Sequence, residues 1–124
     1  METVNLHDKF SRFSDYCNPR VIAEVNDCHV KAVKLKGEFI WHHHDNEDEL
    51  FLVVKGTLRM KFRDREAAVR EAVVREGEFV VVPKGVEHCP VADEEVHIVL
   101  IEPKSTLNTG NITNERTVAQ LERI

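Results

Sequence analysis

The sequence predicts an all-β fold, a small barrel preceded by one short helix. Runs rich in β-branched and aromatic residues recur along the chain, with turn-type residues between them. Some of these runs alternate apolar and charged residues, as a strand with one buried face does. A length of 124 residues suits one core, so we expect a single domain over residues 1–124.

The N-terminal part predicts a helix and then a hairpin. Asn5 is a candidate N-cap, and the apolar residues that follow it recur at helical spacing, so we expect a short helix within residues 5–17 that covers an open edge of the barrel. Strands are predicted at residues 20–25 and 28–36, joined by a turn at Asn26 and Asp27. Gly37 then allows a bend or bulge.

Three histidines follow this bend. In a strand, alternate side chains share a face, so His42 and His44 would lie together while His43 and Asp45 lie on the opposite face. The run of residues 49–54 predicts the next strand, and Glu49 would enter it beside the histidine pair. Imidazole nitrogens and a carboxylate oxygen suit zinc, iron, nickel or manganese, and a third imidazole would complete the site. The alternative is a solvated turn.

A second segment, residues 77–88, supports the metal site. It reads GEFVVVPKGVEH and predicts a turn, a buried strand at residues 79–82, and a tight turn at Pro83 to Gly85. His88 follows this turn directly. The chain therefore returns toward the same interior with an imidazole.

The two segments together resemble the two signature motifs of the cupin family. The first motif is written G-x5-H-x-H-x3,4-E-x6-G, and the second is written G-x5-P-x-G-x2-H-x3-N. The first has counterparts here in Gly37, His42, His44, Glu49 and Gly56, and the second in Gly77, Pro83, Gly85 and His88.

The chain departs from these motifs at two positions. Four residues, rather than five, separate Gly37 from His42, and Ala92 takes the place of the final asparagine. The short spacing leaves a rival register in which His43 and Asp45 replace His42 and His44. We prefer His42 and His44, because a histidine pair is the norm of the family.

The resemblance implies the cupin-type double-stranded β-helix, a jelly-roll barrel. It implies a core at about residues 20–103, a polar C-terminal extension at 104–124, and a divalent transition metal on His42, His44, Glu49 and His88. It also implies a homodimer. The chain looks most similar to small single-domain bacterial cupins that are often named mannose-6-phosphate-isomerase-like, a label that we do not take as an activity, because true phosphomannose isomerases are much longer.

The remaining strands complete the barrel. Residues 58–63 alternate Leu58, Met60 and Phe62 with the basic residues Arg59, Lys61 and Arg63, which would meet an anionic substrate unless they form a solvated face. Residues 67–75 predict a strand despite their helix formers. We expect a polar turn at 91–95, a last strand at 96–101 that is either central or part of an interface, a surface coil at 103–117, and a helical turn within 118–124. By strand parity, the pocket walls should include Ile40, Phe51, Met60 and Ile98.

Composition limits the partners. A formal net charge of −5 argues against nucleic acid or an anionic membrane, both of which need clustered lysine and arginine. The three cysteines form no even framework, and no apolar run is long enough to span a bilayer, so we expect a cytoplasmic protein. Cys89 is expected to be a buried, inert thiol rather than a reactive one beside the metal.

Two functions fit these features. The first is a metal-dependent enzyme acting on a small organic substrate by isomerase, lyase or dioxygenase chemistry. The second is a module that binds a small molecule or a metal, or senses one, without turnover. No catalytic acid or base stands out in the sequence.

Overall fold

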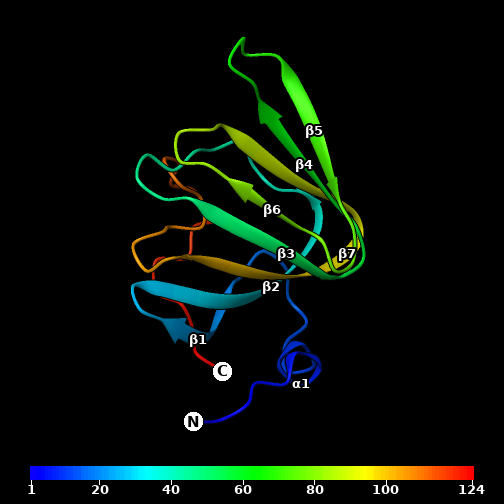
Figure 1. The fold of residues 1–124 in the computed structure, drawn as a ribbon, viewed down its shortest axis with the longest axis vertical. Helices are drawn as coiled ribbons and strands as arrows, with labels where there is room; N and C mark the ends of the chain where they lie inside the picture. The colour runs from blue at the N-terminus through cyan, green and yellow to red at the C-terminus, as the bar shows by residue number, and fades with distance from the viewer.

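The protein is described here by a computed structural model that covers residues 1–124. It has one short helix and seven strands, all paired antiparallel (Figure 1). In chain order the elements are α1 (Leu6–Phe10), β1 (Arg20–Val25), β2 (Cys28–Glu38), β3 (Glu49–Lys55), β4 (Leu58–Arg63), β5 (Val69–Val74), β6 (Phe79–Val82) and β7 (His88–Pro103). The predicted all-β fold with a short N-terminal helix is confirmed, and residues 67–75 do contain a strand.

Strand β7 organises the sheet. The strand order is β1-β2-β7-β3-β6, and β4 pairs with both β7 and β5. β7 therefore contacts β2 along one edge, and β3 and β4 along the other (Figure 1). This makes it a central strand, in agreement with the first of the two expectations for the last strand.

The polar turn expected at residues 91–95 is absent, and the prediction is wrong there. β7 runs without interruption through this region, with Val91 paired to Glu38 on β2 and to Arg59 on β4. The acids at 93–95 are exposed, and Arg59 binds Asp93. Residues 93–95 have no pairing partner, and the ladder with β2 shifts register beside them, so these acids form a bulge within β7 instead of a turn that ends it.

Apolar side chains on the inner face of the sheet fill the interior of the barrel. Twelve buried residues form this core: Val33, Leu35, Phe51, Val53, Leu58, Met60, Val74, Val82, Ala92, Val96, Ile98 and Leu100. The ladder between β2 and β7 shifts register between Leu35 and Gly37, which confirms the predicted irregularity at Gly37. The chain leaves β2 just beyond it and enters the histidine segment.

The helix is shorter than the expected 5–17 range. Asn5 caps it as predicted, since its side chain accepts a hydrogen bond from the Asp8 amide at 2.9 Å. The helix ends at Phe10, because Ser11 caps its C-terminus and polar residues that favour turns follow. Phe10 and Phe13 nevertheless pack on Ala32 and Val99, so the N-terminal segment covers the outer face of β2 and β7.

The C-terminal residues 104–124 form a coil, and the helical turn expected at 118–124 is absent. Instead, Arg123 forms a parallel bridge with Val21 on β1. The coil is ordered by its own polar side chains: Asn108 accepts a hydrogen bond from the Val118 amide, and the hydroxyls of Thr109 and Thr117 bond to each other. No helix of the protein has the length and apolarity that crossing a membrane requires.

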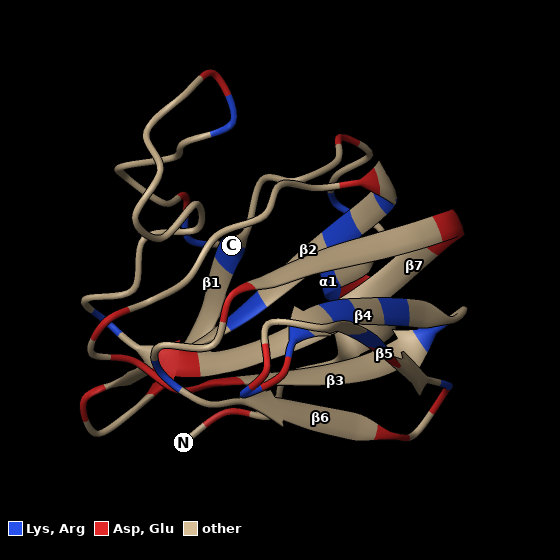
Figure 2. Cartoon of the chain, turned by 90° about the horizontal axis from the view of Figure 1, so that it is seen from above, with Lys and Arg blue, Asp and Glu red and all other residues tan.

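Basic and acidic residues are intermingled. Figure 2 shows basic positions on β2 and β4, and acidic positions mostly in loops. Arg59 donates to Glu71 at 2.6 Å and to Asp93 at 2.9 and 3.0 Å. Its charge is therefore satisfied within the chain, which favours a solvated ionic face over an anion site at this residue.

Candidate metal centre

The two motifs meet through the main chain. His42 lies in the segment between β2 and β3, and His88 begins β7. Their backbones exchange two hydrogen bonds, from the His42 amide to the His88 carbonyl at 3.0 Å and in the reverse direction at 2.9 Å. This isolated bridge brings their rings to a centroid distance of 4.3 Å.

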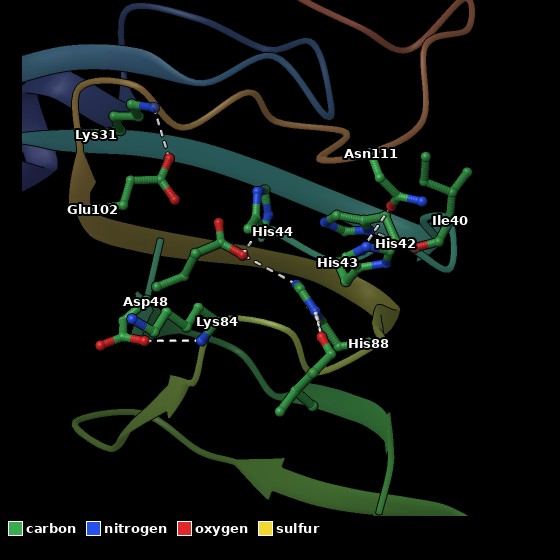
Figure 3. Close-up of polar contacts among 12 residues, drawn as sticks. Lys31, Ile40, His42, His43, His44, Asp48, Lys84, His88, Glu102 and Asn111 are labelled. Atoms are coloured by element: carbon green, nitrogen blue, oxygen red, sulfur yellow. Dashed lines mark hydrogen bonds and ion pairs between the residues drawn. The ribbon is translucent and has the colours of Figure 1, made fainter. Parts of the chain in front are cut away.

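The histidine segment is not the regular strand that the sequence predicts. Only His42 makes a bridge, and the chain is irregular between there and Glu49. Neighbouring loops hold it instead: the Gly85 amide donates to the His44 carbonyl at 2.7 Å, and the Lys84 amide donates to Asp48 at 2.8 Å (Figure 3). The expected alternation of faces still holds, since His42 and His44 are buried and the ring of His43 is partly exposed.

Four potential ligand atoms converge in the interior. The side chains of His42, His44, Glu49 and His88 are all buried, and each offers one ligand atom within 4.8 Å of the others. Glu49 Oε1 lies 2.8 Å from His44 Nε2 and 3.1 Å from His88 Nε2. Figure 3 shows the three imidazoles turned toward one space.

Hydrogen bonds to carbonyl oxygens orient two of the imidazoles. Nδ1 of His42 lies 2.9 Å from the Ile40 carbonyl, and Nδ1 of His88 lies 2.8 Å from the Val86 carbonyl. A carbonyl only accepts, so each Nδ1 carries the proton and each neutral ring presents a lone pair at Nε2. Burial, together with the nearby His88, lowers the pKa of His42 to about 4, so this ring is neutral near pH 7.

Glu49 adds a carboxylate to this set. Burial opposes its ionisation, but close contacts with Glu102, His44 and His88 outweigh burial and hold the pKa of Glu49 well below its usual range. The cluster therefore combines imidazole lone pairs with a negative oxygen.

This set of donors fits a divalent transition metal. Nε2 of His88 and Oε1 of Glu49 are both acceptors when the ring is neutral, and they face each other at 3.1 Å. Nε2 of His44 is buried and has no partner in hydrogen-bond geometry, although Glu49 lies nearby. Atoms that bind one ion at about 2.0–2.2 Å lie about 3 Å apart when their bonds are at right angles, which matches the two contacts of Glu49. A cation in this space would satisfy the lone pairs.

The family model of the cupin domain matches residues 30–102, which include all four of these residues. The chain belongs to the cupin family.

Known proteins agree with this assignment. The "Uncharacterized protein YdbB" of Bacillus subtilis (strain 168) is 43% identical over 67 residues, which are 54% of this cupin and 56% of that protein. The match therefore spans about half the length of this relative. The crystal structure of a cupin-2 domain containing protein from Shewanella frigidimarina NCIMB 400 is 49% identical, with a TM-score of 0.77 over 82% of this cupin and 95% of that chain.

A characterised enzyme shares the fold. The hydroquinone 1,2-dioxygenase from Sphingomonas sp. TTNP3, solved with 4-hydroxybenzoate bound, superposes with a TM-score of 0.73. It is 21% identical to this cupin, and the match covers 84% of this cupin and 32% of the dioxygenase. At that identity the likeness concerns the fold alone.

The rival register falls outside the cluster. The His43 ring contacts Asp45 at 3.0 Å, and Asp45 is exposed. The C-terminal coil holds the backbone of His43, because the Asn111 side chain accepts from its amide at 2.9 Å and the Asn111 amide donates to its carbonyl at 3.0 Å (Figure 3). Gly110 lies so close that a Cβ there would be 2.2 Å from the His43 carbonyl oxygen.

A small cavity adjoins the cluster. Its volume is about 40 Å³, so it is narrow. Of the predicted pocket walls only Phe51 lines it; Met60 and Ile98 are fully buried in the packed core, and Ile40 does not reach it. Its lining is mostly apolar: Cys17, Pro19, Val33, Leu35, Phe39, Phe51, Pro90 and Leu100, with His42, Glu49, Glu102 and Asn108 as the polar members.

Sequence reasoning missed Glu102, a second carboxyl group in the cavity, and Lys31, which contacts it. A usable signal was present. Strand parity places Lys31 on the same face as Val33 and Leu35, and it places Glu102 on the same face as Leu100. A charged residue on an otherwise apolar strand face marks a buried polar contact.

The cysteines stay outside the ligand cluster. All three are free. Cys89 is buried, and burial together with Glu38 raises the pKa of its thiol to about 11. Cys17 lines the cavity, and burial raises its pKa as well. Both thiols are thus protonated at neutral pH, which agrees with the inert role expected of Cys89.

Proposed function

We propose that this cupin binds one divalent transition metal, zinc, iron, nickel or manganese, through His42, His44, Glu49 and His88. The convergence of four buried ligand atoms within 4.8 Å carries this proposal. Three imidazoles and one carboxylate would leave open coordination positions, as sites that act on a substrate do.

We further propose that the metal serves an enzyme acting on a small organic molecule, by isomerase, lyase or dioxygenase chemistry. The bound ion would act as a Lewis acid toward a carbonyl, an enolate or water, or would bind dioxygen if it were iron. The chain's own residues would hold the ion and seat the substrate, while Phe51 and Leu100 would exclude water. The small, mostly apolar cavity beside the cluster supports a compact organic substrate.

A second candidate is a module that binds a small molecule or metal without turnover. The size and lining of the cavity favour it, because a narrow and mostly apolar space suits ligand capture more than water-dependent chemistry. Under either function, we propose one domain over residues 1–124 that pairs as a homodimer. Exposed apolar side chains on β5 and β6, Val69, Val73, Phe79 and Val81, support the dimer.

Elemental analysis of untagged protein, purified without added metal, tests the proposal. We expect one metal ion per chain in the wild type and none in a His42→Ala, His44→Ala double variant. His43→Ala is the matched control, since it removes a neighbouring imidazole outside the cluster, and it should retain the metal. A wild type without metal, or a double variant that keeps it, would contradict the metal site.

The metal that is found directs the search for activity. Iron would lead to oxygen-consumption assays with small phenols, thiols and diketones. Zinc, nickel or manganese would lead to isomerase and lyase assays. Binding of these compounds without any turnover would favour the non-catalytic candidate, and light scattering in the same buffers would give the oligomeric state.

A further inference from the structure

Lys31 and Glu102 form an ion pair deep inside the barrel. Their side chains are each about 1% exposed, and Lys31 Nζ lies 2.6 Å from Glu102 Oε1 (Figure 3). Removing two charges from water costs several kcal/mol per ion, and apolar residues of similar volume often replace such pairs without loss of stability. The pair is therefore poorly explained as a device for stability alone.

The pair is not needed to hold the strands together. Lys31 lies on β2 opposite Leu100, and Glu102 lies on β7 opposite His29, within a continuous antiparallel ladder. The backbone hydrogen bonds of this ladder already join the two strands. The role of the contact between Lys31 and Glu102 therefore depends on the other neighbours of Glu102.

Glu102 meets Glu49. Both line the same cavity, and Oε2 of Glu102 is buried without any donor to bind. Two carboxyl groups that adjoin at a buried site share one proton, since both cannot be ionised there. Leu50 on β3 pairs with Ile101 on β7, so Glu49 and Glu102, one position further along each strand, lie side by side on the inner face. A hydrogen bond between the two carboxyl groups therefore links Glu102 to Glu49.

Glu49 is thus held by two sets of contacts. Its Oε1 faces His44 and His88, and Glu102 contacts the same carboxyl group. A glutamate has several rotatable bonds, so a free carboxylate would sample orientations that miss the imidazoles. Glu102 restricts this freedom, and Lys31 fixes Glu102 in turn.

We propose that the buried Lys31–Glu102 pair is a positioning device for Glu49, orienting the carboxylate toward the three imidazoles of the metal centre. This inference rests on the metal site proposed above. Partners that hydrogen-bond to metal ligands typically alter metal affinity by about 10- to 100-fold when they are removed.

The test measures the binding of cobalt(II) alone, by its visible ligand-field spectrum and by competition with a chelator. A Lys31→Met, Glu102→Leu double variant replaces the pair with apolar side chains and avoids leaving a bare buried charge. We expect it to fold with a melting temperature near that of the wild type, to bind cobalt about 10- to 100-fold more weakly, and to show a shifted spectrum.

Two further variants separate positioning from a structural role. Glu102→Gln keeps a hydrogen-bond donor for Glu49, so it should restore the wild-type spectrum and most of the affinity. Glu102→Asp keeps a carboxyl group for Lys31 but withdraws it from Glu49 by one methylene, so it should shift the spectrum even if the double variant fails to fold. Lys34→Met is the matched control: it removes another buried lysine of β2, one that donates to the Phe13 carbonyl at 2.6 Å, and it should leave cobalt binding unchanged.

Wild-type affinity and spectrum in the Glu102→Asp variant, or in a folded double variant, would overturn the positioning role. That result would leave the metal site standing, provided that the wild type binds cobalt and the His42→Ala, His44→Ala variant does not. Absence of cobalt binding in the wild type and in Lys34→Met would instead refute the metal site, and the positioning role with it.

Discussion

Replacing Gly110 by alanine should detach the C-terminal coil from the histidine segment. Gly110 has a φ of +58°, and a Cβ at this position would lie 2.2 Å from the His43 carbonyl oxygen and 3.0 Å from the His42 ring. The left-handed conformation costs an alanine about 1–2 kcal/mol. Relief of the clash would break the two hydrogen bonds between Asn111 and the His43 backbone, worth about 1 kcal/mol each. We therefore expect a loss of about 3–4 kcal/mol in the free energy of unfolding.

The Gly77→Ala variant is a control that separates the cost of the left-handed backbone conformation from the cost of steric crowding. Gly77 has a φ of +80°, but nothing lies within 4 Å of a Cβ placed there, so only the cost of about 1–2 kcal/mol applies. Urea unfolding should give the larger loss for Gly110→Ala, and limited proteolysis should cut its C-terminal coil faster. Metal should also dissociate faster from Gly110→Ala than from the wild type, whereas Gly77→Ala should keep the wild-type rate. Equal losses in the two variants, with equal proteolysis, would refute the idea that close approach at Gly110 secures the histidine segment.

Three other predictions concern the core, the thiols and acid stability. Phe51→Ala should lower the free energy of unfolding by about 3–5 kcal/mol in urea, because the ring is buried beside the cavity, while Val25→Ala, at an exposed residue of β1 outside the proposed dimer surface, should change it by less than about 0.5 kcal/mol; similar losses would contradict the assigned burial. At pH 8, iodoacetamide followed by peptide mass spectrometry should label Cys89 more slowly than Cys28, because the Cys89 thiol is buried and its pKa is raised to about 11; fast labelling of native Cys89 would disagree. Hydrogen bonds from Lys104 and Arg123 lower the pKa of Glu24 from 4.5 to about 2, so the stability from these pairs is present above pH 4.5 and is lost as the pH falls toward 2. The protection factors of residues 118–124 against hydrogen exchange, taken relative to the intrinsic rate at each pH, should therefore fall over this range in the wild type, and Glu24→Gln should show the lowered protection already at pH 6; unchanged protection in the variant would count against the pairing.

The sequence predicted the strands and the group of four side chains because both follow from local patterns. Period-two alternation locates β4, and residue type and spacing single out His42, His44, Glu49 and His88. The preference for His42 over His43 rested on residue identity, and the structure places His43 outside the cluster. That these four residues bind a metal stays a prediction until metal content is measured.

The failures come from long-range contacts. Residues 91–95 look like a turn because of their acids, yet Val91 and Ala92 pair with neighbouring strands on one side and Val96 on the other, so the three acids become a bulge within β7. The pocket walls were inferred from parity alone, which cannot tell a fully packed side chain such as Met60 from one beside a cavity. Lys31 and Glu102 lie 71 positions apart, and only the pairing of β2 with β7 brings them together.

The central place of β7 has a consequence for the order of folding. This strand supplies pairing partners to β2, β3 and β4, it begins with His88, and it carries Glu102 near its end. Until residues 88–103 have docked, the first motif lacks its third imidazole and Glu49 lacks its second carboxyl contact. Sheets built from contacts between distant parts of a chain form slowly, because the entropy of loop closure is lost before those contacts stabilise the chain. We therefore expect a metal ion to enter a barrel that is already closed, so that it stabilises the finished fold without serving as its nucleus.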